Sequence, residues 1–167
     1  IPYWRSTSPA TITANASDDS GVAEVTLWYR YSPDNSTWGA WTSFDSDPAE
    51  PWEWDFDFPE GEGYYEFYTV ANDTAGNKES APSTADTSCA YDSTPPSITD
   101  NSPAAGTTGD PYTFRAVAAD NLALSEVRVI YWFGNGTQTN STMMHTTADN
   151  FVLEIIIPLN SLSTLHY

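Results

Sequence analysis

Apolar and polar residues alternate one by one along much of this chain, and no stretch shows the period of about 3.6 that a helix would require. The segment 52–58 is the clearest example, because large apolar side chains occupy every second position and acids stand between them. The apolar positions are Trp52, Trp54, Phe56 and Phe58, and the acidic positions are Glu53, Asp55 and Asp57. This alternation predicts a β-strand with one face in a core and the other in water.

Three further segments alternate in the same way, at 11–17, 25–31 and 64–71. Turn-forming residues separate them, at 17–21, 32–36, 45–51, 59–63 and 72–77. Short strands at this spacing predict an all-β fold, an antiparallel β-sandwich. The residues expected to meet between its two sheets are Leu27, Tyr29, Trp52, Trp54, Phe56 and Phe67.

The chain also repeats itself. Residues 14–29 match residues 116–131 at an offset of 102, and residues 52–59 match residues 151–158 at an offset of 99. If the second offset continues, Tyr167 aligns with Tyr68 and His166 with Phe67. A unit of about 100 residues has the size of one antiparallel sandwich domain, so the repeat predicts two tandem domains.

We expect one β-sandwich domain at 1–92, a proline-rich hinge at 93–96, and a second such domain at 97–167. Strands of the second domain are predicted at 97–103, 112–119, 126–133 and 151–157, with a short one near 139–144. Because residues 69–92 have no counterpart, the second domain is expected to be incomplete at its C-terminus. Two explanations stay open: residues beyond Tyr167 complete it, or a neighbouring subunit inserts a strand.

Two residues of that domain suggest an assembly surface. Where residues 52–58 turn only acids outward, the matching strand turns out Val152, Glu154 and Ile156. Apolar β-branched side chains on a face that should meet water suggest that something covers Val152 and Ile156.

Charge and composition narrow the classes of function. The chain carries 23 acidic and five basic side chains, a net charge of −18, which disfavours nucleic acid and anionic lipid as partners. No apolar run is long enough to span a membrane, so no membrane insertion is expected in this segment. Without an initiator methionine or a leader, the chain is interpreted as a piece of a longer polypeptide. The single cysteine, Cys89, is expected to be a buried free thiol, with a bond to another chain as the alternative.

Five Asn-x-Ser/Thr sequons indicate a glycosylated, secreted protein. They lie at Asn15, Asn35, Asn72, Asn135 and Asn140. Asn15 alternates away from two alanines of a predicted strand, while Asn35, Asn72 and Asn135 fall in predicted loops. We therefore expect those four side chains to reach solvent.

The segment TITANASDDSGVAEVTLWYRYSPDNSTWGAWT, then PWEWDFDFPEGEGYYEFYTVANDTAGN and a D-S-T-P-P hinge, resembles the tandem immunoglobulin-like repeats of prokaryotic, and especially archaeal, cell-surface proteins. The tyrosine-rich strand is also similar to fibronectin type III modules, in which a tyrosine near the start of that strand fixes a corner; Tyr64 and Tyr65 are the candidates here. The resemblance implies a fold and an extracellular, cell-surface location, and no particular activity.

Catalytic chemistry is not expected. His145 and His166 are the only histidines, and neither lies in a recognisable motif. No nucleophile elbow, zinc-binding spacing or phosphate-binding loop is present. The carboxylates of the 52–58 strand project into water, whereas a glycosidase pair requires a cleft. The chain is therefore predicted not to be an enzyme.

Calcium is the one cofactor that the acidic residues suggest. Asp18 and Asp19 occupy a turn equivalent to that of Asp120, Asp73 lies in a loop expected at the same end of the sandwich, and Asp92 adjoins the hinge. Carboxylates from neighbouring loops suit calcium. The alternative is that these residues bond their own backbone and simply form the turns.

Three tryptophans suggest a second binding function. Trp28 is expected on the face opposite the core, and Trp38 and Trp41 flank a Gly-Ala turn. Exposed rings could stack on sugars and make this a carbohydrate-binding adhesin module. The alternative is that Trp38 and Trp41 cover an edge of the sandwich.

Among the functions considered, the sequence most favours a non-catalytic structural module of a surface or filament protein, with other subunits or domains of the same protein as partners.

Overall fold

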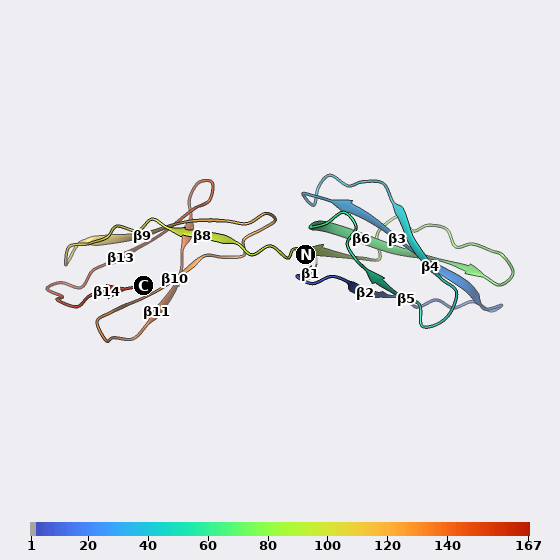
Figure 1. Cartoon of the computed structure of the whole chain (residues 1–167), viewed down its shortest axis with the longest axis horizontal. Coiled ribbons are helices and arrows are strands. Elements are labelled where there is room, and N and C mark those ends of the chain that lie inside the picture. The colour runs from blue at the N-terminus through green and yellow to red at the C-terminus, as the bar shows by residue number, and fades with distance from the viewer. Residues whose placement is uncertain (1–2) are drawn as a thin grey trace. The chain divides into compact units, whose positions relative to one another are not determined.

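The computed structural model describes residues 3–167, and β-strands are the only regular elements in that range. The chain is therefore all-β, as predicted, with several sheets and a pattern consistent with a β-sandwich (Figure 1). It divides into two compact units, with the boundary between Ser93 and Thr94.

In the first unit, residues 3–93 form seven strands in two sheets. They are β1 (Tyr3–Arg5), β2 (Ala10–Thr13), β3 (Val22–Ser32), β4 (Thr42–Asp47), β5 (Glu53–Phe56), β6 (Gly63–Asp73) and β7 (Thr87–Tyr91). The larger sheet has the order β1-β7-β6-β3-β4, and the smaller one pairs β2 with β5. All neighbours are antiparallel except β1, which runs parallel to β7.

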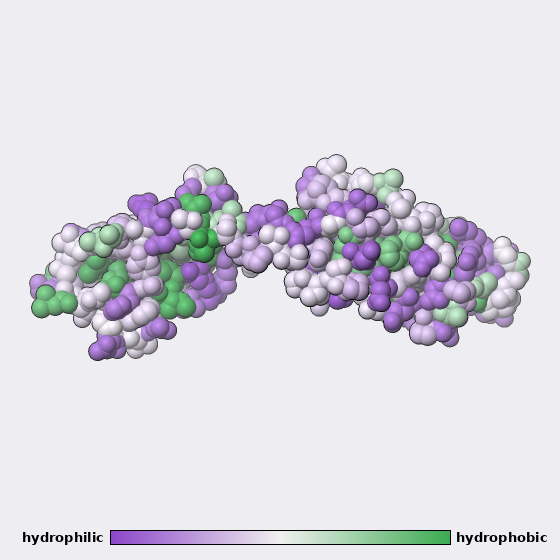
Figure 2. Space-filling model, in the orientation of Figure 1, coloured by the Kyte–Doolittle hydropathy of each residue, from purple (hydrophilic) through white to green (hydrophobic). Residues whose placement is uncertain are grey.

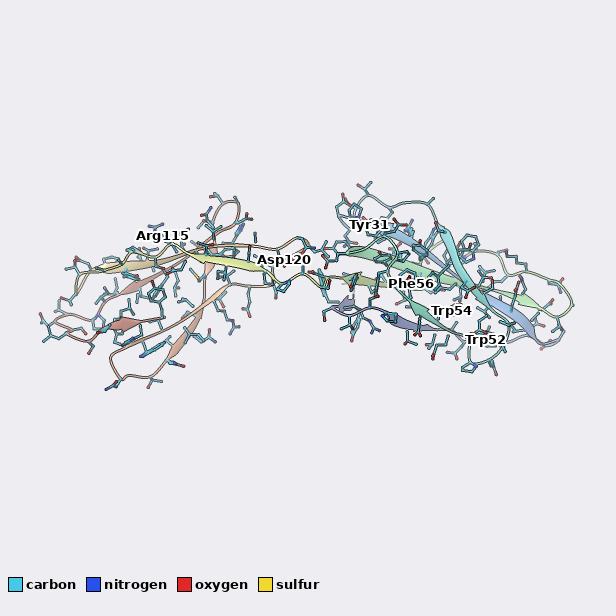
Figure 3. All side chains as sticks on the ribbon, viewed as in Figure 1. Tyr31, Trp52, Trp54, Phe56, Arg115 and Asp120 are labelled. Carbon is cyan, nitrogen blue, oxygen red and sulfur yellow. The ribbon has the colours of Figure 1, made fainter. Side chains whose placement is uncertain are left out.

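The core of this unit lies between those sheets and is dominated by aromatic rings. Phe56 on β5 is fully buried, and the rings of Tyr29, Phe44, Tyr65 and Phe67 surround it at centroid distances of 4.8–5.5 Å. All six residues predicted for the core are buried, namely Leu27, Tyr29, Trp52, Trp54, Phe56 and Phe67. The acids between the buried positions of 52–58 are exposed, so the alternation was interpreted correctly. Figure 3 labels three of the buried positions, Trp52, Trp54 and Phe56.

The second unit contains the other seven strands, again in two sheets. They are β8 (Ser97–Asp100), β9 (Pro111–Ala119), β10 (Arg128–Phe133), β11 (Thr139–Thr142), β12 (Met144–His145), β13 (Asn150–Ile156) and β14 (Leu165–His166). The sheets have the orders β12-β13-β9-β8 and β11-β10-β14. Tyr112, Phe114, Phe151 and Ile157 are among the buried residues between them.

The internal repeat reappears as a shared pairing register. The matching pairs are Ala10 with Phe56 and Ile12 with Trp54 in the first unit, and Tyr112 with Ile155 and Phe114 with Leu153 in the second. Each residue of the second set lies 102 or 99 positions after its counterpart, as the sequence alignment requires. Equivalent residues therefore occupy equivalent places in β2 and β5 and in β9 and β13.

The alignment of the last strand was wrong by one residue. In the first unit Arg30 pairs with Glu66, whereas in the second unit Trp132, which is equivalent to Arg30, pairs with His166. His166 therefore matches Glu66, and not Phe67, so the offset is 100 here. The loop that follows Pro158 holds one residue more than the loop after Pro59, which sequence matching alone did not detect.

Two predicted elements also differ from the structure. The strand expected over 11–17 ends at Thr13, although burial continues to alternate as far as residue 17 and the Ala14 amide donates to the Trp52 carbonyl at 3.1 Å. Asn72, expected in a loop, belongs to the end of β6. The strand continues because Asn72 pairs with Glu24 of β3.

Candidate functional site

The three predicted tryptophans do come together, on the outer face of the larger sheet in the first unit. On that face, Trp28 and Arg30 of β3 stand opposite Tyr68 and Glu66 of β6. We call the group formed by Trp28, Arg30, Trp38, Trp41, Glu66 and Tyr68 the outer cluster.

A tight turn carries Trp38 and Trp41 back over this face. The Asp34 carboxylate accepts hydrogen bonds from the backbone N–H groups of Ser36 and Thr37, at 2.9 and 2.7 Å, and these bonds lower the pKa of that carboxyl well below its usual range. Asn35 takes the left-handed conformation, with φ of 56°, as asparagine tolerates better than most residues. The Gly39 N–H then donates to the Tyr31 carbonyl at 2.9 Å, which returns the loop to β3.

Planar groups alternate through the outer cluster. The Trp28 ring stacks on Tyr68, with centroids 5.9 Å apart and an angle of 15°, and Trp41 contacts the same tyrosine at 4.4 Å. The Arg30 guanidinium lies 4.7 Å from the Trp41 ring and 5.1 Å from the Trp38 ring. Arg30 Nε also donates to Glu66 Oε2 at 2.7 Å, so the arginine is held by charge and by stacking.

This packing argues against a flat platform for sugars. Trp28, Trp38 and Trp41 are all half-buried, and the ring contacts above occupy faces that a sugar would need. Tyr68 beneath them is buried, and burial raises the pKa of its hydroxyl. The cluster covers the outer face of the larger sheet, whereas the alternative stated for Trp38 and Trp41 was that they cover an edge of the sandwich.

The sequence had signals for Trp28, Trp38 and Trp41 but gave none for Arg30, Glu66 and Tyr68 as their partners. The polar positions of β3 and β6 alternate with core positions, so Arg30 and Glu66 could be assigned to an outer face. Whether Arg30 contacts Glu66, which lies 36 residues later in the sequence, depends on the pairing register of β3 and β6. No local pattern specifies that register.

The acidic residues proposed for calcium form turns of their own. Asp18 Oδ1 accepts from the Ser20 N–H at 2.8 Å, and both Asp73 oxygens accept from Asn77, at 2.7 and 2.6 Å. The bonds to Asn77 lower the pKa of the Asp73 carboxyl. Asp120, labelled in Figure 3, accepts from the N–H groups of Leu122 and Ala123 at 3.0 and 3.1 Å.

Asp18 and Asp73 line one hollow of about 610 Å³ at the end of the first unit, as expected from their loops. Thr74 joins the two loops by donating its hydroxyl to the Ser20 carbonyl at 2.5 Å. Within residues 3–167, no group of three or more His, Cys, Asp or Glu side chains is arranged to hold a metal ion. Asp19 is exposed, and the Asp92 N–H donates to the Arg5 carbonyl at 2.9 Å.

Four of the five sequons have exposed asparagines: Asn15, Asn35, Asn135 and Asn140. Asn72 differs from the expectation, because its side chain is half-buried and its Nδ2 donates to Glu24 Oε1 at 2.6 Å. That nitrogen is the atom to which a glycan would be attached, so Asn72 is the sequon least suited to modification.

The remaining candidate residues are the cysteine, the two histidines and the two apolar residues of the expected assembly surface, and they differ in burial. Cys89 is a buried free thiol on β7, and burial raises its pKa to about 11. His145 packs against the Phe151 ring, and His166 stacks on Trp132 with centroids 5.2 Å apart. On the outer face of β13, Val152 is half-buried and Ile156 is 61% exposed.

Residues 3–167 form no α-helix, and so none that could span a membrane. Comparisons with models of known protein families, with curated proteins and with solved structures find no match for this chain.

Proposed function

We propose that this chain is a pair of immunoglobulin-like modules from an extracellular cell-surface or filament protein of a prokaryote, most similar to archaeal ones. The modules have a non-catalytic role in spacing, adhesion and contact between subunits. The repeated pairing register carries the proposal, since two units built on the same register are what tandem repetition of one module produces.

The surface of the first unit supports this role. Its outer cluster closes the face of the larger sheet with stacked rings, and its exposed acids bond nearby backbone groups in turns. Such a surface favours solubility and durability in an extracellular medium. Exposed sequon asparagines on both units are accessible to a glycosylation machinery.

Fractionation of source cells tests the location and the modification together. Limited proteolysis of intact cells should release peptides of this chain, and mass spectrometry should detect glycans on Asn15, Asn35, Asn135 and Asn140. Asn72 serves as the internal control, because its engaged Nδ2 should leave it unmodified. Peptides found only in the cytoplasmic fraction, with all five sites unmodified, would contradict the proposal.

A further inference from the structure

The hollow of about 610 Å³ in the first unit has a wall that hydrogen bonds hold in place. It lies between the loop before β3, the end of β6 and the segment that leads into β7. The Thr69 N–H donates to Asp86 Oδ2 and the Ala71 N–H donates to Glu79 Oε2, both at 3.1 Å. The Glu79 N–H donates back to the Ala71 carbonyl at 2.9 Å. These bonds fix the segment against β6, so the hollow is preformed.

The lining of the hollow has an apolar part and a polar part. Val25 is buried and Val22 and Ala71 are half-buried, whereas Lys78 and Asp86 are exposed and provide a charged donor and a charged acceptor. A sugar ring has the same two characters, with C–H groups on its faces and hydroxyl groups around its edge. The volume also lies within the range of about 300–1,000 Å³ that is usual for small-molecule sites.

Asn72, which also lines the hollow, has an oxygen whose hydrogen-bonding capacity is not used. The bond from Asn72 Nδ2 to Glu24 Oε1 fixes which end of the side-chain amide is the oxygen. That oxygen, Oδ1, is buried and has no hydrogen-bond partner among residues 3–167. A buried acceptor without a donor is unfavourable, and a hydroxyl group in the hollow would supply the donor. Asn72 therefore points to a ligand that carries hydroxyl groups.

One of the exposed sequon asparagines stands at the same hollow. Asn15 lines it and is exposed, and Ser17, which provides the hydroxyl group of that sequon, lines it as well. A sugar attached to Asn15 Nδ2 therefore starts beside the hollow. A short flexible tether gives an effective concentration in the millimolar range, so contacts too weak to bind a free sugar are sufficient for an attached one.

From these features we infer that the hollow binds the first sugar of a glycan on Asn15. The ring lies against Val22 and Ala71, and its hydroxyl groups reach Lys78 and Asn72 Oδ1. The sugar is then a fixed part of the surface of the first unit. The inference rests on the proposed function for the presence of the glycan, whereas the hollow and its lining belong to the first unit itself.

Attaching one sugar chemically tests the contact without a cellular glycosylation machinery. Asn15→Cys in the whole protein is alkylated with an iodoacetamide that carries N-acetylglucosamine, and mass spectrometry confirms one sugar per chain, since Cys89 is buried. One control is the same variant capped with iodoacetamide alone, and the other carries the sugar on Asn135→Cys, at an exposed sequon of the second unit. We expect nuclear Overhauser effects from the sugar ring to the methyl groups of Val22 and Ala71 in the first protein only.

Hydrogen exchange measures whether the attached sugar closes the hollow. The amides of Thr69 and Ala71 donate to carboxylates of its wall, so the sugar on position 15 should slow their exchange at least about threefold relative to the capped control. The sugar on position 135 should leave both amides unchanged. Absence of the Overhauser effects would overturn the inference, and so would equal exchange with the sugar and with the cap.

These results are distinguishable from a failure of the proposed function. If cells glycosylate Asn15 but the attached sugar makes none of these contacts, only the inference about the hollow is overturned. If cells leave all five sequons unmodified, the glycoprotein part of the proposed function is contradicted, and this inference is overturned with it.

Discussion

Tyr65 combines two roles at the start of β6. Its ring is fully buried among the core aromatics, and its hydroxyl donates to the Gly61 carbonyl at 2.7 Å, four residues upstream. Burial is the main reason that the pKa of this hydroxyl is raised. A tyrosine that bonds back to the backbone at the start of this strand is the corner feature found in immunoglobulin-like and fibronectin-like sandwiches. The sequence left Tyr64 and Tyr65 as alternatives, and the geometry identifies Tyr65.

Replacing each of the two tyrosines with phenylalanine separates them. Tyr65→Phe should lower the free energy of unfolding by about 1 kcal/mol, because it removes one hydrogen bond and leaves the ring in place. Tyr64→Phe is the matched control and should change it by less than about 0.5 kcal/mol. Urea denaturation followed by tryptophan fluorescence measures both variants. Equal effects of the two substitutions would show that the Tyr65 hydroxyl does not fix the corner.

Trp54 tests the orientation of the whole strand β5. It is 4% exposed between the two sheets, so Trp54→Ala should cost about 3–5 kcal/mol through lost burial and the cavity that remains. Asp55→Ala, at the next and exposed position, should cost less than about 0.5 kcal/mol. Thermal and urea unfolding give both values. A Trp54→Ala protein as stable as the parent would mean that the faces of the strand are reversed.

Cys89 makes a prediction about reactivity and pH. Burial raises the pKa of its thiol from 9.0 to about 11, against a smaller opposing effect of Arg5. At pH 8 the folded protein should therefore react with iodoacetamide on the order of 100-fold more slowly than the urea-unfolded chain. The stabilisation from the neutral thiol is fully present below about pH 9 and is lost as the pH rises through 11. Equal labelling rates in the folded and unfolded states would contradict this account.

At the scale of the elements, Arg30 of β3 links the parts of the outer cluster, because it contacts Glu66 of β6 and the rings of Trp38 and Trp41. Arg30→Ala should lower the free energy of unfolding by about 1–2 kcal/mol, since the guanidinium contacts two tryptophan rings and a carboxylate at a partly exposed site. Arg30→Lys keeps the charge beside Glu66 and loses the planar stacking, so its free energy of unfolding should lie between those of the parent and Arg30→Ala. Urea unfolding ranks the three proteins. Identical stability of all three would show that the cluster contributes nothing measurable.

The strands expected from the sequence agree with the observed strands in some places and not in others. The β5 region and most of β3 and β6 were predictable, because strong alternation encodes which face of a strand is buried. The strand β4 was not, since Phe44 is its only large apolar residue and its acids and serines resemble a turn. Partners across strands, such as Arg30 with Glu66, and the one-residue shift at β14 depend on register and loop length. Local alternation carries no information about either.

At the scale of the molecule, the two units differ in charge and in apolar exposure. The first carries seventeen acidic and three basic side chains, a net −14, and the second six and two, a net −4. Among residues 3–167, nine large apolar side chains are exposed, and seven of these lie in the second unit, including Ile98, Ile130, Ile156 and Leu162. Figure 2 shows apolar residues (green) reaching the surface of the unit that Figure 1 draws from yellow to red. The first unit is therefore the more strongly charged of the two, and the second exposes more large apolar side chains.

The difference in charge predicts that salt will act on the two units unequally. Self-repulsion of a folded unit grows roughly with the square of its net charge and is screened by ions. Raising NaCl from about 0.02 to 0.5 M should therefore stabilise the first unit by several-fold more than the second. Hydrogen exchange read at the amides of β3 and of β9 follows each unit separately, so no assumption of a single unfolding transition is needed. Each unit also contains an ion pair that salt weakens, Arg30 with Glu66 in one and Arg128 with Glu126 in the other. If salt changed the stability of the two units equally, or destabilised the first unit, the ion pairs would outweigh the repulsion among the acids of the first unit.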